Sequence, residues 1–263
     1  MLLMVLAALA APAVGPCGPG RVRSACPEAE AVRAEAELAA VAKALPGAID
    51  AINDAGMERS AEDLAAWKAR AAEVASLWTG FREARCDPAL LRFEGQAGPV
   101  QSGACRARIS RAAAADFGFR YGLGGRTFGR RDVETEATAP RPSAEDAGPC
   151  AHPLPAECDY CGMNHCWETR LKADDARLNA AWRRALATIA AKPGMTATQR
   201  RDWAARLRAA QRAWLRWRDA DCELERLETP NPWAHSIYAL VTGPCLAGET
   251  EARTAVLART YGR

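Results

Sequence analysis

The chain has 263 residues, ten cysteines and a formal net charge of +3. Its length suits two domains of roughly 100 residues each. Ten cysteines are unusual for a cytosolic protein, whose thiols stay reduced, and they indicate an oxidising compartment. The arginines alternate with acidic residues at helical spacing and form no concentrated basic stripe with exposed aromatics, which argues against nucleic-acid binding.

Residues 1–13 are predicted to be a signal peptide. Residues 1–11 are almost wholly apolar, and the small residues Ala11 and Ala13 suit signal-peptidase cleavage. The stretch is far too short to span a bilayer, and the residues before Cys17 do not resemble a lipoprotein box. We therefore expect a periplasmic or secreted protein with no membrane span.

The cysteines recur in two sets with similar spacing. Successive gaps are 9, 60 and 19 residues in the first half and 8, 56 and 23 residues in the second. The two sets are Cys17, Cys26, Cys86 and Cys105, and Cys158, Cys166, Cys222 and Cys245. Cys86 and Cys222 each follow two tryptophans, an aromatic residue and an arginine at matching offsets. This correspondence predicts a tandem duplication, with units at 14–121 and 158–263.

Helical periodicity dominates the first unit. A helix is expected over about 27–44, ended by Pro46 and Gly47. Ser60 and Asp63 open a second helix, which stops near Cys86. A loop rich in Gly then leads to Cys105, and a third helix follows to about residue 121.

Residues 122–157 are rich in Gly, Pro, Thr and charge, which predicts a linker. In the second unit, apolar residues at helical spacing predict a helix that ends at 192–194. Thr196 and Gln199 form a capping box for the next helix, which should stop before residue 229. A loop over 229–244 leads to Cys245, and a short helix is expected over about 248–261. The predicted fold is therefore all-α, with two tandem disulfide-stapled helical-hairpin units, each with a short third helix.

All ten cysteines are disulfide candidates: the eight above, with Cys150 and Cys161. Four cysteines per unit allow three pairings, and spacing alone does not choose between them. We favour local bridges: Cys17–Cys26, Cys86–Cys105, Cys158–Cys166, Cys222–Cys245 and Cys150–Cys161. The crossed alternative joins Cys26 to Cys86 and Cys166 to Cys222.

A zinc site is the competing interpretation of one cysteine cluster. Cys158, Cys161, His165 and Cys166 have the ligand types and spacing of a zinc knuckle. Zinc would need reduced thiolates, which the oxidising compartment opposes, and the duplication explains two of these cysteines without a metal. We therefore expect disulfides, no metal and no cofactor.

The segment QRAWLRWRDADC, residues 211–222, resembles the signature of the LprI-like lysozyme-inhibitor family. That family of small bacterial envelope domains carries a Gln, a Trp, a second aromatic, an Arg-Asp pair and a Cys at this spacing. The upstream helix agrees through Asp174, Asp175, Leu178, Asn179 and Trp182, and Cys245 and Arg253 agree downstream. The resemblance covers residues 158–263 and implies a lysozyme inhibitor.

The first unit resembles the family less closely. It keeps Trp78, Phe81, Arg82 and Cys86, but Ala75 stands in place of Gln211, Glu83 replaces Asp219, and the Leu-Asn pair is missing. We interpret it as a degenerate copy.

The signature residues admit two interpretations. In the structural one, Arg218 pairs with Asp174 or Asp175 across the hairpin while the tryptophans fill the core. In the functional one, α-helical and loop residues form a binding face. Its candidate members are Gln211, Arg216, Arg218, Asp219, Trp233, His235 and Tyr238, the last three in the 229–244 loop, whose aromatic groups suit a protein contact.

No hydrolase motif such as GxSxG or HExxH occurs, so we do not expect an enzyme. The favoured hypothesis is a secreted or periplasmic binding protein, possibly a lysozyme inhibitor. The alternatives are a structural envelope module that binds another envelope protein and, less favoured, a zinc-binding module. The expected partner is thus a protein, and the oligomeric state stays open.

Overall fold

The computed structural model describes residues 26–95, 98–123, 159–229 and 235–262, without the side chains of 98–99, 159–164 and 235–240. These residues form helices and short turns, with no strand among them. The first half contains α1 (Cys26–Ile52), a π-helix η1 (Asn53–Met57), α2 (Ala61–Arg85), α3 (Pro88–Phe93) and α4 (Gly98–Arg120). The second half contains α5 (Asp159–Ala190), α6 (Ala197–Leu227) and α7 (His235–Tyr261). The all-α prediction is confirmed.

Both predicted helix starts are present. The Ser60 hydroxyl accepts a hydrogen bond from the backbone N–H of Asp63 at 3.1 Å and caps α2. Thr196 and Gln199 form the full capping box that opens α6, with reciprocal hydrogen bonds of 2.8 and 3.2 Å.

The predicted end of the first helix was wrong. Pro46 lies inside α1, which continues to Ile52 and then passes through η1 to a left-handed Glu58. Proline removes one backbone hydrogen bond from a helix. The apolar face of α1 nevertheless runs past Pro46, since Leu45 before it and Ile49 after it are both buried. Packing of this face therefore offsets the local cost of the proline.

The third helix of each half also begins earlier than predicted. α4 has 23 residues, and α7 has 27 and starts at His235, so most of the predicted 229–244 loop is helical. Pro244 lies inside α7. The short helix α3 was not predicted. Asp87 caps it, and Pro88 occupies its first turn, a favoured position for proline.

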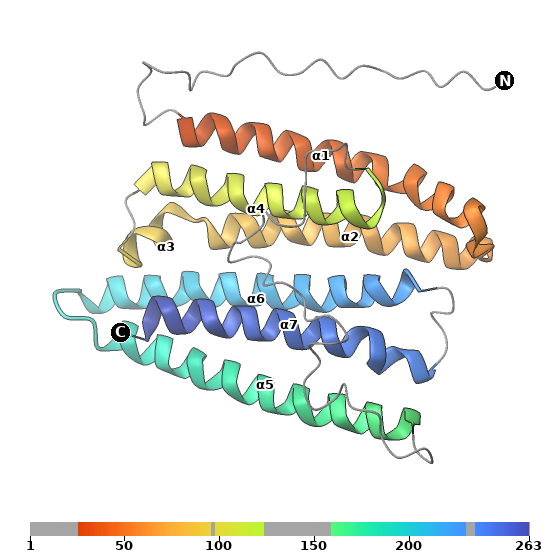
Figure 1. Cartoon of the computed structure of the whole chain (residues 1–263). Coiled ribbons are helices and arrows are strands. Elements are labelled where there is room, and N and C mark those ends of the chain that lie inside the picture. Colours follow the sequence, from red (N-terminus) through yellow and green to blue (C-terminus); the bar gives the residue numbers. More distant parts are fainter. Residues whose placement is uncertain (1–25, 96–97, 124–158, 230–234, 263) are drawn as a thin grey trace.

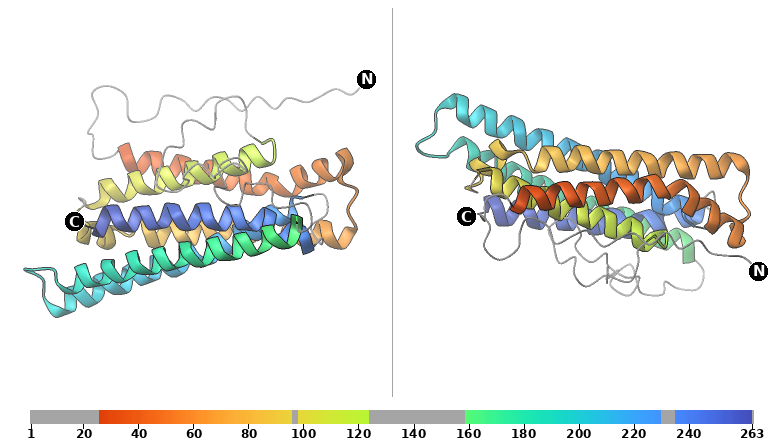
Figure 2. Two further views of the ribbon diagram at one scale, coloured as in Figure 1. Left: turned by 60° about the horizontal axis from the view of Figure 1, so that its bottom comes forward. Right: turned by 90° about the horizontal axis from the view of Figure 1, so that it is seen from above.

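The three long helices of each half pack against one another, and the two halves meet along α2 and α6. α1 packs mainly on α4, α5 packs mainly on α7, and α2 and α6 lie side by side between these pairs (Figures 1 and 2). Two glycines permit close helix crossings. A Cβ on Gly103 would lie 2.8 Å from the backbone of Pro27, and a Cβ on Gly243 would lie 2.8 Å from the ring of Trp167.

These two crossings occupy matching positions in the halves. Each glycine stands two residues before the third-helix cysteine, and each partner follows the first-helix cysteine directly. This alignment of the two halves matches Cys26 with Cys166, Cys86 with Cys222, and Cys105 with Cys245. The duplication itself and the unit boundaries at 14–121 and 158–263 remain predictions, and the predicted signal peptide and nearly all of the predicted linker lie outside the described residues.

One hydrophobic core joins the two halves. The ring of Trp217 on α6 lies 4.3 Å from that of Trp78 on α2, and it stacks on Phe81 at 5.9 Å. All three residues are buried. The α2–α6 contact is therefore a continuous core rather than a loose junction between domains.

Two reciprocal hydrogen bonds flank this contact. Tyr121, just after α4, donates to Glu228 of the second half, and Tyr261 at the end of α7 donates to Glu94 of the first. Burial raises the pKa of Glu228, and nearby Asp221 adds to this, against the opposing effect of Arg120. The tyrosine at the C-terminal end of each half therefore contacts a glutamate of the other half.

Two predicted disulfides are confirmed, Cys86–Cys105 and Cys222–Cys245. They contradict the crossed alternative, because Cys86 and Cys222 are already bonded to third-helix cysteines. Cys26 and Cys166 are also disulfide-bonded. The predicted pairs Cys17–Cys26, Cys158–Cys166 and Cys150–Cys161 involve positions outside the described residues.

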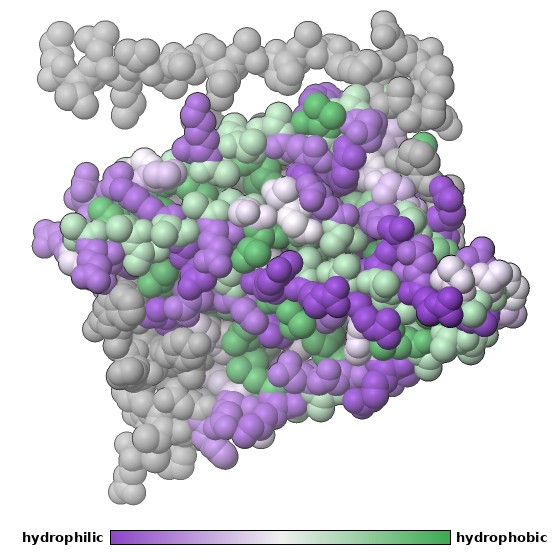
Figure 3. All heavy atoms as spheres, turned by 180° about the vertical axis from the view of Figure 1, so that it is seen from behind, coloured by the Kyte–Doolittle hydropathy of each residue, from purple (hydrophilic) through white to green (hydrophobic). Residues whose placement is uncertain are grey.

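Hydrophilic side chains are spread over the face shown in Figure 3 and are interspersed with smaller hydrophobic areas. Within the described ranges, no helix has the length and apolar character to cross a membrane.

Candidate functional site

Two of the predicted binding residues on α6, Gln211 and Arg218, contact the neighbouring helices α5 and α7. Gln211 is buried, and its Oε1 accepts a hydrogen bond from Nε of Arg253 on α7 at 2.8 Å. The guanidinium groups of Arg218 and Arg253 lie 5.0 and 5.9 Å from the ring centroid of Trp214. Trp214 therefore packs in the core with cations near its ring.

Arg218 connects the three helices of the second half. Its Nη1 donates to the Thr250 hydroxyl at 3.0 Å and lies 3.8 Å from the Asp175 carboxylate, and its Nη2 lies 2.7 Å from Asp219. Asp174 instead accepts hydrogen bonds from Arg170 and Arg177 on its own helix. The structural interpretation of Arg218 therefore holds, with Asp175 as its partner across the hairpin.

The first half repeats this arrangement at the corresponding positions. Nη1 of Arg82 donates to the Ser110 hydroxyl at 3.2 Å, and its Nε lies 3.7 Å from the Glu35 carboxylate. In both halves an arginine on the second helix thus contacts an acid on the first and a hydroxyl on the third. Because both halves contain these arginine contacts, we assign them a role in folding rather than in a binding function of the second half alone.

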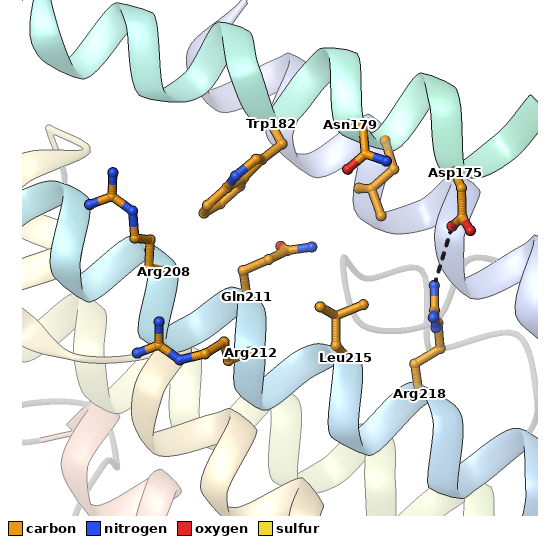
Figure 4. Close-up of a pocket in the computed structure, with 9 residues that line it drawn as sticks. Asp175, Asn179, Trp182, Arg208, Gln211, Arg212, Leu215 and Arg218 are labelled. Atoms are coloured by element: carbon orange, nitrogen blue, oxygen red, sulfur yellow. Dashed lines mark ion pairs between the residues drawn. The ribbon is translucent and has the colours of Figure 1, made fainter.

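A pocket of about 450 Å³ lies between α5 and α6 (Figure 4). We call it the α5–α6 pocket. It is lined by Asp175, Leu178, Asn179, Trp182, Arg208, Gln211, Arg212, Leu215 and Arg218. Apolar groups from both helices form part of its wall, and amide and charged groups lie among them, a mixture typical of ligand and protein-contact sites.

The charge of the pocket lining is predominantly positive. Three arginines face one carboxylate, and that carboxylate already lies beside Arg218. Arg208 and Arg212 are exposed and one helical turn apart, and Arg216 is exposed one turn further along. Among the described residues, these three arginines have no ion pair. Like charges at this spacing disfavour the helix slightly, so helix stability does not explain them.

The corresponding surface of the first half lacks these groups. Ala39, Ala42, Ala72, Ala75 and Ser76 stand in the positions of Asn179, Trp182, Arg208, Gln211 and Arg212. Gln211 and Ala75 are equally buried, with 8% and 9% of their surfaces exposed. The two halves therefore share the packing beneath the pocket and differ in the side chains that line it.

The predicted binding residues are only partly brought together. Gln211 and Arg218 line the pocket, whereas Arg216 and Asp219 are exposed outside its lining. Trp233 lies outside the described residues, and His235 and Tyr238 belong to the first turns of α7, where side chains are not described.

Arg208 and Arg212 were not among the predicted binding residues. The signal was present, because arginines at 208, 212 and 216 share one helix face without a carboxylate at helical spacing between them. Asn179 and Trp182 entered only through the family resemblance.

The predicted zinc alternative is weakened by the sulfur chemistry. Cys166 is disulfide-bonded, so it has no thiolate to offer a metal, and His165 is exposed. Over the part of the chain that the structure describes, no group of three or more potential ligands could hold a metal ion. Cys158 lies outside the described residues, and the side chain of Cys161 is not described.

Comparison with known proteins finds one family match, and it lies in the second half. Residues 155–257 match the family model described as lysozyme inhibitor LprI. This range contains α5, α6 and most of α7, and therefore the whole α5–α6 pocket. No curated protein and no solved structure matches the chain.

Proposed function

We propose that this protein, whose residues 155–257 are of the LprI type, is a secreted or periplasmic, non-enzymatic protein that binds and inhibits a lysozyme. The family match is the observation that carries the proposal. The disulfides Cys86–Cys105 and Cys222–Cys245 support the location, since such bridges persist outside the cytosol.

The α5–α6 pocket supports binding. Its lining offers guanidinium, amide and indole groups, which recognise other molecules through hydrogen bonds, charge and apolar contact. Arg and Trp are also enriched among the residues that dominate binding energy in protein interfaces.

A lysozyme inhibition assay with the full, oxidised chain tests the proposal. The full chain is needed because α6 shares its core with α2. We expect inhibition of cell-wall hydrolysis by at least one of a panel of purified lysozymes at micromolar protein. The same chain after reduction and alkylation is the control and should lose this activity. If the correctly bridged protein inhibits none of the panel, the proposal fails and the envelope-scaffold alternative is favoured.

A further inference from the structure

We infer that the α5–α6 pocket is the contact surface for the lysozyme, that it receives a protruding, carboxylate-bearing segment, and that each chain offers one such surface. The inference rests on the proposed function and names the part of this molecule that performs it. It comes from three observations: the exposed arginines, the shape of the pocket and the difference between the halves.

The arginines determine the charge of the partner. Arg208 and Arg212 line the pocket, are exposed, and have no carboxylate partner among the described residues. A guanidinium group can bind a carboxylate through two parallel hydrogen bonds, which a lysine cannot do. An acidic segment would supply the missing counter-charges, whereas a basic segment would be repelled.

The shape of the pocket determines which acidic groups fit. The pocket lies between two helices, and its lining includes Leu178, Leu215 and Trp182. Trp182 on α5 faces the side of α6 that carries Arg208 and Gln211 (Figure 4). A hollow surface accepts a convex segment, and carboxylates recessed in a catalytic cleft cannot enter it. The partner segment is therefore a surface loop of the lysozyme that carries Asp or Glu next to an apolar side chain. Inhibition follows from covering the enzyme rather than from inserting a loop into its cleft.

The difference between the halves determines the stoichiometry. Arg82 and Arg218 each contact an acid on the first helix and a hydroxyl on the third helix of their half, so the two halves pack alike at this position. Around these arginines, the exposed Arg208 and Arg212 correspond to Ala72 and Ser76 in the first half. A role in the packing that the two halves share would require such side chains in both halves. Their restriction to the second half indicates binding there and a supporting role for the first.

The test uses the full, oxidised chain and a lysozyme that the wild type inhibits. The variant is the double substitution R208E and R212E, which replaces two exposed arginines of the pocket lining. The control is R33E with K43E, because Arg33 and Lys43 are exposed on α1 and the net charge changes equally. Circular dichroism and a thermal melt confirm that both variants fold. Isothermal titration calorimetry and inhibition are measured at about 50 mM and 500 mM salt.

We expect the pocket variant to bind at least roughly tenfold more weakly at low salt, with a smaller difference at high salt, where charge interactions are screened. The control should bind within about twofold of wild type, and the wild type should bind one lysozyme per chain. If wild type inhibits and the folded pocket variant inhibits equally well, the pocket is not the contact surface, although the proposed function stands. Two lysozymes per chain would overturn the single-surface inference. Failure of the wild type to inhibit any lysozyme would refute the proposed function itself.

Discussion

The hydroxyl of Tyr261, in the last turn of α7, lies 2.6 Å from a carboxylate oxygen of Glu94, which follows α3 in the other half of the chain. The other oxygen of Glu94 lies 2.9 Å from Arg85. Tyr121 makes the corresponding contact with Glu228 in the opposite direction. The two halves are therefore joined at both ends of a shared core, and we expect them to unfold together.

Trp217 tests the shared core. Replacing it by alanine removes a buried ring that contacts both Trp78 and Phe81, and it should lower the free energy of unfolding by about 3–5 kcal/mol. Trp182→Ala, in the half-buried pocket wall, is the matched control and should cost less than half as much. Urea unfolding followed by circular dichroism gives both values. Two separate transitions in wild type, one for each half, would contradict the shared core.

Gly243 tests the close crossing of α5 and α7. A methyl group there would approach the Trp167 ring to 2.8 Å, so Gly243→Ala should destabilise the fold by about 1–3 kcal/mol. Gly80→Ala is the control, because Gly80 lies inside α2 and nothing lies within 4 Å of the new Cβ. That change should stabilise the protein by about 0.5–1 kcal/mol. Equal melting temperatures for the two variants would show that the crossing is looser than described.

The two confirmed disulfides should contribute similarly. They close loops with sequence separations of 19 and 23 residues, and loop-closure entropy depends only weakly on such a difference. Replacing either pair by serines should cost about 2–5 kcal/mol. Chemical unfolding measures the cost, and peptide mapping without reduction verifies the pairing in wild type. Peptides that join Cys26 to Cys86 would contradict the assignment.

Glu228 should make stability depend on pH. Its pKa is raised in the folded state by burial, with Asp221 nearby, so the folded protein takes up this proton at a higher pH than the unfolded chain. The resulting stabilisation is complete below the unfolded pKa, about 4.3, and is lost as pH rises through the folded value. Relative to Glu228→Gln, wild type should therefore gain stability between pH 7 and 4. A relative loss on acidification would show that Arg120 dominates.

The sequence predicts the helices well where caps and apolar spacing agree. Thr196 and Gln199 mark the start of α6 because their hydrogen bonds are local. Pro46 suggested a helix end, but long-range packing of Leu45 and Ile49 holds it inside α1. The contact between Trp78 and Trp217 joins residues far apart in the chain, so spacing alone could not reveal it.

The site was less predictable than the fold. Gln211 and Arg218 stood out through the family signature, yet both make buried or half-buried contacts with neighbouring helices. Arg208 and Arg212 can be recognised as pocket residues only once the position of α5, which forms the opposite wall, is known. Sequence spacing gives the face of one helix, but a pocket needs the relative position of two.

Hydrogen exchange of the full chain, alone and in complex with an inhibited lysozyme, tests the central claim most directly. We expect slower exchange in residues 175–182 and 208–218, which line the α5–α6 pocket, and no change in the corresponding residues 35–42 and 72–82 of the first half. Slower exchange in the first-half segments, with the pocket segments unchanged, would contradict the account.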